Sequence, residues 1–305
     1  MYTDIKTILD DAVKNKYAVL ACSGINLETL RGMIAAADAE QAPLIILMGQ
    51  AQITKHASPE LMIPMIKTLA EKTNVPIATL LDHGRDWDKI TEAYRNGFSS
   101  IMIDASAYDF DENVARTKKI VELCHPQGLA VEGELGHVGV AATLDNLDTS
   151  IYTKPEEAVK FVEETHVDSL AIACGTAHGQ YPKGFVPTLS FDVIKNVRAA
   201  VNVPLALHGT SGAGEENIRK AVEAGINKVN IATEIFCYVR DKINNLMKEN
   251  PDIDYLSLKI AEEQAAKEIT RHFIQVIGTS GKAKNFTKTY NFGHDIHKID
   301  TGVGE

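Results

Sequence analysis

Short apolar runs of strand length alternate along the chain with longer segments whose apolar residues recur at helical spacing. Segments 26–40, 111–125, 154–166 and 214–225 are typical of the helical kind. Eight runs have strand length, and they begin at Tyr17, Pro43, Pro76, Ser99, Leu129, Ser169, Pro204 and Lys228. Nearly continuous apolar strands that alternate with helices predict a parallel sheet covered by helices. Eight such units in about 240 residues predict a (β/α)8 TIM barrel, an α/β fold; a doubly wound open sheet is the alternative.

After the eighth run, segments 234–250 and 257–278 continue with helical character and contain no further strand pattern. We therefore expect extra C-terminal helices that pack on the barrel or on a neighbouring subunit. The predicted organisation is a single barrel domain with these helices at 1–283, followed by a polar tail at 284–305.

Composition excludes several classes of protein. The 305 residues are 45% hydrophobic and 24% charged, as in a globular protein with a full core. A formal net charge of −10 argues against nucleic acid or an anionic membrane as the main partner. No stretch approaches the roughly 18 apolar residues of a membrane span, and the charged N-terminus does not resemble a signal peptide. The four cysteines form no CxxC pair, so we expect reduced thiols in a cytoplasmic protein.

Polar residues stand where the predicted strands end, and in a TIM barrel these ends form the active-site mouth. They are Asp82, His83, Asp104, Glu132, Glu134, His178 and His208. Three histidines from different strands suit a divalent metal, above all zinc, so His83, His178 and His208 are predicted ligands, with Glu134 as an additional or alternative one. Asp82 is predicted to carry a proton to or from a substrate or, alternatively, to orient His83.

Glycines and small hydroxyl residues adjoin these histidines in "HGQYPK", "HGTSG" and "NIAT". Loops after the seventh and eighth strands of such barrels often bind phosphate through backbone N–H groups. Each segment alone reads as an ordinary turn, but together they favour a phosphate bound beside a metal.

The motifs "LDHG", "MIDAS", "VEGELG", "GTAHGQY", "LHGTSG" and "VNIATE" occur in this order. Over about 1–283 the chain resembles the class II, zinc-dependent ketose-bisphosphate aldolases, of the fructose- and tagatose-bisphosphate type. The resemblance implies a TIM barrel and reversible aldol cleavage of a phosphorylated ketose to dihydroxyacetone phosphate and an aldehyde. It also implies zinc or another divalent metal, a monovalent cation, a homodimer or homotetramer, and a place in carbohydrate metabolism.

The resemblance assigns roles to matching positions. Asp82 matches the proton donor to the aldehyde oxygen; His83, His178 and His208 match the zinc ligands, and Glu134 matches an acidic position that approaches the metal. Arg271 matches an arginine that reaches the far phosphate from a neighbouring subunit. The positions that hold dihydroxyacetone phosphate correspond to Gly179, Lys183, Gly209, Ser211, Asn230 and Thr233.

The chain departs from the family at Ser23, Gly49 and Ala142, and "DASA" replaces "DGSH" after the fourth strand. Ala142 stands in place of the loop glutamate that moves the proton at the donor carbon. One explanation is an aldolase for another substrate. The residues considered as the replacement base are Asp145, Asp148, Glu132 and His137. The alternatives are a catalytically weak barrel that keeps zinc and phosphate for a binding or regulatory role, and a zinc hydrolase.

Overall fold

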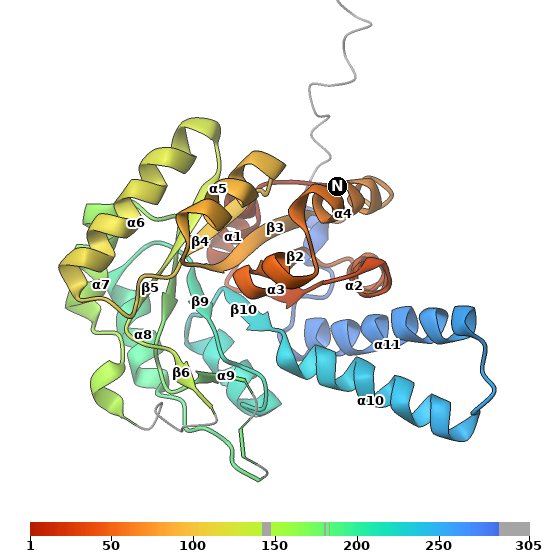
Figure 1. Cartoon of the computed structure of the whole chain (residues 1–305). Coiled ribbons are helices and arrows are strands. Elements are labelled where there is room, and N and C mark those ends of the chain that lie inside the picture. Colours follow the sequence, from red (N-terminus) through yellow and green to blue (C-terminus); the bar gives the residue numbers. More distant parts are fainter. Residues whose placement is uncertain (142–147, 180, 183, 287–305) are drawn as a thin grey trace, which may run out of the picture.

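Eight parallel strands close into a barrel in the computed structural model, which describes residues 1–141, 148–179, 181–182 and 184–286 (Figure 1). The order around the barrel is β1-β10-β9-β7-β5-β4-β3-β2. These strands are β1 (Val19–Ser23), β2 (Leu44–Gly49), β3 (Ile77–Gly84), β4 (Ser100–Ile103), β5 (Ala130–Leu135), β7 (Ser169–Ile172), β9 (Leu205–Leu207) and β10 (Lys228–Ile231). The predicted TIM barrel is confirmed, and the open sheet is excluded.

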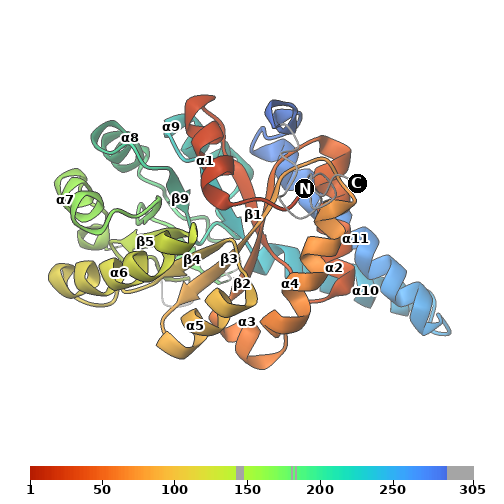
Figure 2. The ribbon, with the colours of Figure 1, turned by 90° about the horizontal axis from the view of Figure 1, so that it is seen from above.

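Helices surround the barrel, as the view from above shows (Figure 2). They are α1 (Ile5–Lys14), α2 (Leu27–Glu40), α3 (Gln50–Lys55), α4 (Pro59–Glu71), α5 (Trp87–Asn96), α6 (Phe110–Cys124), α7 (Pro155–Thr165), α8 (Phe191–Ala200), α9 (Glu215–Ala224), α10 (Thr233–Glu249) and α11 (Tyr255–Val276). Two further strands, β6 (Gly139–Val140) and β8 (Ala177–His178), pair with each other outside the barrel.

The barrel interior and the ring of helices form two apolar clusters. The interior is filled by small and medium side chains such as Ala78, Ala171 and Leu80. Helix α1 adds Ile8 and Leu9 to this same cluster, so its apolar face closes one end of the barrel. Apolar burial of this kind stabilises the closed end, which leaves the opposite end, where the strands terminate, for chemistry.

The C-terminal helices α10 and α11 form a hairpin that projects from one side of the barrel (Figure 1). Helix α11 packs closely on α2, because a Cβ on Gly32 would lie 2.3 Å from the Glu263 carbonyl oxygen. Glycine at this position therefore sets the distance between the two helices.

Within the described part of the chain, no helix is both long enough and apolar enough to cross a membrane. Several predictions concern positions outside the described residues, namely Ala142, Asp145, Lys183 and the tail beyond residue 286.

Candidate active site

A backbone irregularity explains why strand β3 ends in Asp-His-Gly. The register between β3 and β4 shifts between Leu81 and Gly84, which marks a β-bulge, and His83 has a left-handed φ of 50°. A Cβ on Gly84 would lie 2.8 Å from the Met102 carbonyl oxygen, so only glycine fits. Bulges next to active sites commonly redirect a side chain. Here the bulge presents Asp82 and His83 together at the mouth of the barrel.

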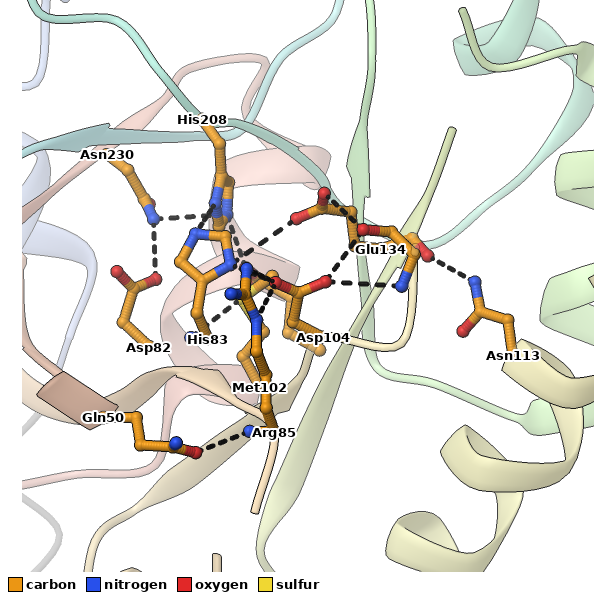
Figure 3. Close-up of polar contacts among 12 residues, drawn as sticks. Gln50, Asp82, His83, Arg85, Met102, Asp104, Asn113, Glu134, His208 and Asn230 are labelled. Atoms are coloured by element: carbon orange, nitrogen blue, oxygen red, sulfur yellow. Dashed lines mark hydrogen bonds and ion pairs between the residues drawn. The ribbon is translucent and has the colours of Figure 1, made fainter. Parts of the chain in front are cut away.

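Three histidine rings meet at this mouth (Figure 3 shows two of them). The ring centre of His83 lies 4.6 Å from that of His178 and 4.9 Å from that of His208. One nitrogen from each ring lies within 4.8 Å of the others. Since the rings come from β3, β8 and β9, the barrel must fold before the group forms.

Carboxylates fix which nitrogens of two rings carry hydrogen. His83 Nδ1 lies 2.9 Å from Asp104 Oδ2, and His208 Nε2 lies 3.0 Å from Glu132 Oε1. When these nitrogens donate to the carboxylates, His83 Nε2 and His208 Nδ1 present lone pairs, yet they face each other at 3.1 Å. Two lone pairs this close repel unless a cation or a proton lies between them.

His178 completes the arrangement. Its Nε2 is buried and has no hydrogen-bond partner among the described residues. Burial, reinforced by the neighbouring His83 and His208, lowers the pKa of His178 to about 3, so its ring is neutral and can donate a lone pair. The three nitrogens therefore fit a divalent metal such as zinc.

The pKa of His83 responds to opposing influences. Burial lowers it, but the charges of Asp82, Asp104 and Glu134 outweigh burial and raise the pKa to about 9. Despite its own burial, Asp104 has a pKa held well below its ordinary value by hydrogen bonds from His83 and Arg85. Since a metal and a proton compete for the same nitrogen, metal binding to His83 would release a proton.

Glu134 approaches the same nitrogen of His83 that contacts Asp104. Its Oε2 is 3.8 Å from Nδ1, and its Oε1 accepts a hydrogen bond from Ser106 Oγ at 3.0 Å. Oε2 is buried without a hydrogen-bond partner among the described residues, and burial raises the pKa of the carboxyl. His83, Asp104 and Glu134 thus form a second group close enough to hold a cation.

Glu132 belongs to a buried ion pair that sequence reasoning did not anticipate. It accepts hydrogen bonds from Lys228 Nζ at 2.8 Å and Ser169 Oγ at 2.9 Å. Burial opposes ionisation, but Lys228 and His208 together lower the pKa of Glu132 to about 2. A lysine inside the apolar run that begins at residue 228 was the available signal, because a buried lysine requires a carboxylate partner.

Asp82 faces a cavity of about 800 Å³ whose walls also include His83 and His178. Its Oδ1 accepts a hydrogen bond from Asn230 Nδ2 at 3.1 Å (Figure 3). The Asn230 amide nitrogen also lies 3.2 Å from His208 Nε2. Asn230 therefore lies between Asp82 and the histidine group.

The predicted phosphate-binding residues lie on the neighbouring strand ends. Ser211 and Thr233 share a cavity of about 510 Å³, and Thr233 is the first residue of α10. Ser211 Oγ accepts from the backbone N–H of Glu234, whose carboxylate accepts from the Gly212 N–H at 3.2 Å. The Glu234 N–H thus binds a hydroxyl oxygen at the start of α10, and the Gly212 N–H binds a carboxylate beside it.

Only glycine fits at position 209, because the loop after β9 passes close to the backbone of Ala177. Gly209 has a φ of 64°, and a Cβ there would lie 2.6 Å from the Ala177 backbone. Gly179 follows His178 directly, is exposed and also has a left-handed φ.

One predicted site residue, Arg271, does not join this group within the described chain. Arg271 lies on α11, where its Nε bonds to Glu40 Oε1 at 2.5 Å. Lys183 lies outside the described residues.

The structure gives different surroundings to the residues considered as the replacement base. His137 is exposed and lines the cavity that holds Asp82, His83 and His178. Asp148 caps a short 3-10 helix by accepting from the Ser150 N–H at 2.9 Å. Glu132 is committed to Lys228 and His208, and Asp145 lies outside the described residues.

Arg85 is a further residue that sequence reasoning missed. Its Nε and Nη2 lie 2.9 and 2.6 Å from the same Asp104 oxygen that contacts His83. An arginine directly after "DHG" was the available signal, although only the fold brings it to Asp104.

A group of side chains that fits a metal thus lies at the C-terminal ends of the strands of a parallel barrel, beside the loops that the sequence predicts to bind phosphate. The family model for "Fructose-bisphosphate aldolase class-II" matches residues 3–282. The protein YdjI of Escherichia coli K12 is 40% identical over 285 residues, which cover 93% of this chain and all of YdjI. The chain therefore belongs to the class II fructose-bisphosphate aldolase family.

Solved structures agree with this assignment. The crystal structure of the YdjI aldolase from E. coli K12 is 39% identical with a TM-score of 0.82, covering 93% of this chain and 100% of that chain. A protein from Coccidioides immitis assigned as a fructose-1,6-bisphosphate aldolase is 29% identical, with a TM-score of 0.80 and coverage of 92% and 98%. Fructose-bisphosphate aldolase from Campylobacter jejuni, at 22% identity, TM-score 0.79 and coverage of 92% and 97%, shares the fold.

Proposed function

We propose that this protein is a zinc-dependent lyase that cleaves a phosphorylated ketose, reversibly, to dihydroxyacetone phosphate and an aldehyde. His83, His178 and His208 would hold the metal. The observation that carries the proposal is the convergence of three ring nitrogens: His83 Nε2 and His208 Nδ1 lie 3.1 Å apart, and the buried Nε2 of His178 beside them has no partner among the described residues. Bound there, zinc supplies a Lewis acid that makes the hydroxymethylene protons of dihydroxyacetone phosphate acidic.

Asp82 handles the proton of the aldehyde half. In aldol addition its carboxyl gives a proton to the aldehyde oxygen as the carbon–carbon bond forms, and in cleavage the substrate hydroxyl returns it. Asn230 Nδ2 holds Asp82 Oδ1 at 3.1 Å and so fixes its direction.

His137 takes the proton from the hydroxymethylene carbon of the donor. It replaces the loop glutamate whose place Ala142 occupies. Support comes from its exposed position on the wall shared with Asp82 and His178, while Glu132 and Asp148 are engaged elsewhere.

Small groups at the ends of β9 and β10 hold the donor phosphate. Ser211 and Thr233 line the cavity at the start of α10, where N–H groups suit an anion, and Gly209 would approach the donor from the end of β9. Gly179 and Lys183 would complete this cradle from the loop after β8, and Asn230 would contact the donor beside it.

We infer further that the protein is a single barrel domain over 1–283 that works in the cytoplasm as a homodimer or homotetramer. Phosphorylated sugars are cytoplasmic metabolites, and buried thiols such as Cys22 and Cys174 suit a reducing compartment. Large apolar side chains exposed on the α10–α11 hairpin support association with a second copy.

The deciding experiment follows proton exchange. Zinc-loaded protein is incubated with dihydroxyacetone phosphate in heavy water, and the hydroxymethylene proton signal is followed by NMR. We expect the signal to decay faster than with metal-stripped protein. No exchange, with donor binding shown separately by calorimetry, would refute the aldolase proposal and favour a barrel that only binds.

A further inference from the structure

One wall of the cavity that Asp82 lines carries no charge. It runs from the end of β2 into α3, and the residues that line the cavity there are Gly49, Gln50, Ala51, Gln52 and Thr54. The whole cavity measures about 800 Å³. Ligand pockets of about 300–1,000 Å³ enclose molecules of drug size, so this cavity has room for more than a two- or three-carbon aldehyde.

Glycine at position 49 is not required by the backbone. Gly49 has a φ of −70° and a ψ of 150°, a conformation that every residue adopts. Apart from neighbouring residues, the nearest atoms to a Cβ built there would be Gln52 Cδ and Oε1, both at 3.7 Å. At Gly84, by contrast, a Cβ would lie 2.8 Å from the Met102 carbonyl oxygen. Position 49 therefore lacks a side chain for which there is space.

A side chain at position 49 would lie on the aldehyde side of the site. Gly49 pairs with Asp82 in the register of β2 and β3, and residues paired across neighbouring strands present their side chains to the same face of the sheet. A Cβ on Gly49 would lie 3.9 Å from the Asp82 carbonyl oxygen. Because Asp82 is proposed to serve the aldehyde oxygen, the open space at Gly49 adjoins the aldehyde half of the substrate.

The loop after β4 widens the same cavity. Ala107 lines it, and this alanine stands where "DGSH" has its histidine, because the chain reads "DASA". Gly49 is likewise a departure from the family, and no residue is smaller than glycine. Two separate departures thus both leave more space beside Asp82.

Hydrogen bonds hold the uncharged wall in place. Gln50 Oε1 accepts from the backbone N–H groups of Arg85 at 2.7 Å and Asp86 at 2.9 Å, which ties the start of α3 to the loop after β3 (Figure 3). The Gly49 N–H donates to Gln52 Oε1 at 2.9 Å. Movement of the wall into the cavity would break these bonds, so the space stays open for a ligand.

Gln52 also offers a hydrogen-bond donor. Its Oε1 is identified as the oxygen because it accepts from the Gly49 N–H, and the same bond fixes the orientation of the amide. Gln52 Nε2 has no hydrogen-bond partner among the described residues. A fixed amide donor on an uncharged wall suits the oxygen of a substrate hydroxyl.

We propose that Gly49, Ala107 and Gln52 determine which aldehyde the protein uses, and that this aldehyde is a hydroxylated chain of four or more carbons. Gly49 and Ala107 leave room for the chain, and Gln52 Nε2 donates to one of its hydroxyl oxygens. The substrate of the cleavage reaction is then a ketose phosphate of seven or more carbons. This inference rests on the proposed aldolase function and names the substrate class of the same site.

The test measures kcat/KM for the addition of dihydroxyacetone phosphate to glycolaldehyde, glyceraldehyde and erythrose, which have two, three and four carbons. Each variant is compared with the wild type for the same aldehyde, so the hydration and ring closure of that aldehyde cancel. We expect Gly49→Val and Ala107→Leu to lower kcat/KM about 10–100-fold for erythrose and less for glycolaldehyde, because the added carbons occupy the space of the longer chain.

Gln52→Glu tests the hydrogen bond separately. It keeps an oxygen for the Gly49 N–H and removes the NH2 donor, so we expect kcat/KM to fall about 3–10-fold for erythrose and less for glycolaldehyde. Ala199→Val, at an exposed position of α8 outside the cavity lining, is the control and should keep the wild-type ratios. Proton exchange of the donor is measured in each variant, because it involves no aldehyde and reports on the donor site alone.

The outcomes that overturn the inference are distinguishable. Equal losses with all three aldehydes in Gly49→Val and Ala107→Leu would reject the role of these positions in aldehyde choice and leave the aldolase function standing. Reaction of the wild type with the two shorter aldehydes but not with erythrose would reject the longer substrate. Unchanged ratios in Gln52→Glu would reject the hydrogen bond. Failure of every aldehyde together with absent proton exchange would reject the proposed function and the inference with it.

Discussion

At the scale of single residues, His178 offers the most direct test of the metal centre. Its Nε2 has no hydrogen-bond partner among the described residues, so removing the ring breaks no known bond of that nitrogen. We expect His178→Ala to lower zinc affinity at least about 100-fold while leaving circular dichroism unchanged. Elemental analysis after dialysis measures the zinc. His56→Ala, at an exposed position outside the cavity, serves as control, and wild-type zinc content in His178→Ala would contradict the assignment.

Replacement of Asp82 should impair the aldehyde half of the reaction and spare the donor half. If it serves the aldehyde, Asp82→Asn should lower cleavage by about 10² to 10⁴ yet preserve zinc content and proton exchange of the donor. The same preparation is assayed for cleavage, metal and exchange. Asp88→Asn, on the exposed first turn of α5, controls for the loss of one charge. Simultaneous loss of zinc and exchange in Asp82→Asn would instead mean that Asp82 orients His83.

His137 is the corresponding residue for the donor half. We expect His137→Gln to slow proton exchange of dihydroxyacetone phosphate by about 10² to 10⁴ without loss of zinc, because a positioned base is removed. NMR in heavy water measures the rate, with His125→Gln as a control, because His125 follows the C-terminal end of α6 and does not line the cavity. An unchanged exchange rate would assign the base to a residue outside the described part of the chain, such as Asp145.

At the scale of strands, the pair of Glu132 on β5 and Lys228 on β10 spans the barrel interior. Lys228→Met leaves Glu132 buried without its ammonium partner, so we expect a loss of about 3–5 kcal/mol in the free energy of unfolding at pH 7. Glu132 has a folded pKa of about 2, below its ordinary 4.5, despite burial, because of Lys228 and His208. Its stabilisation is therefore complete above about pH 4.5 and disappears as the pH falls toward 2.

Urea unfolding at pH values from 7 to 3 checks this pair. The difference in unfolding free energy between wild type and Lys228→Met should be constant near neutrality and shrink below about pH 4.5. Lys220→Met, in an exposed pair with Glu216, should cost less than about 1 kcal/mol. A wild-type advantage that does not change with pH would show that packing, not charge, explains the loss.

The apolar pattern of the sequence predicts the strands and their ends, but not the contacts that depend on strand register. Alternating apolar runs predict the eight strands, and the C-terminal ends of parallel strands must share one face, so Asp82, His83, His178 and His208 could be grouped in advance. Glu132 and Lys228 are 96 residues apart, and their contact depends on strand register across the interior. Arg85 needed the β3 bulge and the Gln50 contacts to reach Asp104, which no periodicity encodes.

At the scale of the whole molecule, the two ends of the barrel have different tasks. Helix α1 closes one end with apolar side chains, which contributes to stability. The opposite end carries the three histidines and the cavity that Asp82, His83 and His178 line. The α10–α11 hairpin belongs to neither end, and it projects from the side with Tyr255, Leu256 and Ile260 exposed by 75%, 68% and 60%.

The exposed apolar side chains of the α10–α11 hairpin predict that the protein associates with copies of itself. Exposed apolar side chains on a projecting hairpin are costly in water, so we expect a second copy to cover them in a symmetric homodimer or homotetramer. Light scattering coupled to size exclusion should give a mass of two or four chains, and Leu256→Asp should reduce it toward one chain without loss of zinc. Glu262→Gln, on the same helix, is the polar control; a monomeric wild type would reject the assembly.

Assembly also decides the role of Arg271, which pairs with Glu40 of its own chain. If Arg271 reaches the far phosphate of a neighbouring subunit, a monomeric Leu256→Asp protein should cleave a ketose bisphosphate less efficiently than the wild type. Proton exchange of the donor should persist, because the histidines lie within one barrel. Unchanged cleavage by the monomeric protein would instead show that Arg271 serves its own chain, where it pairs with Glu40.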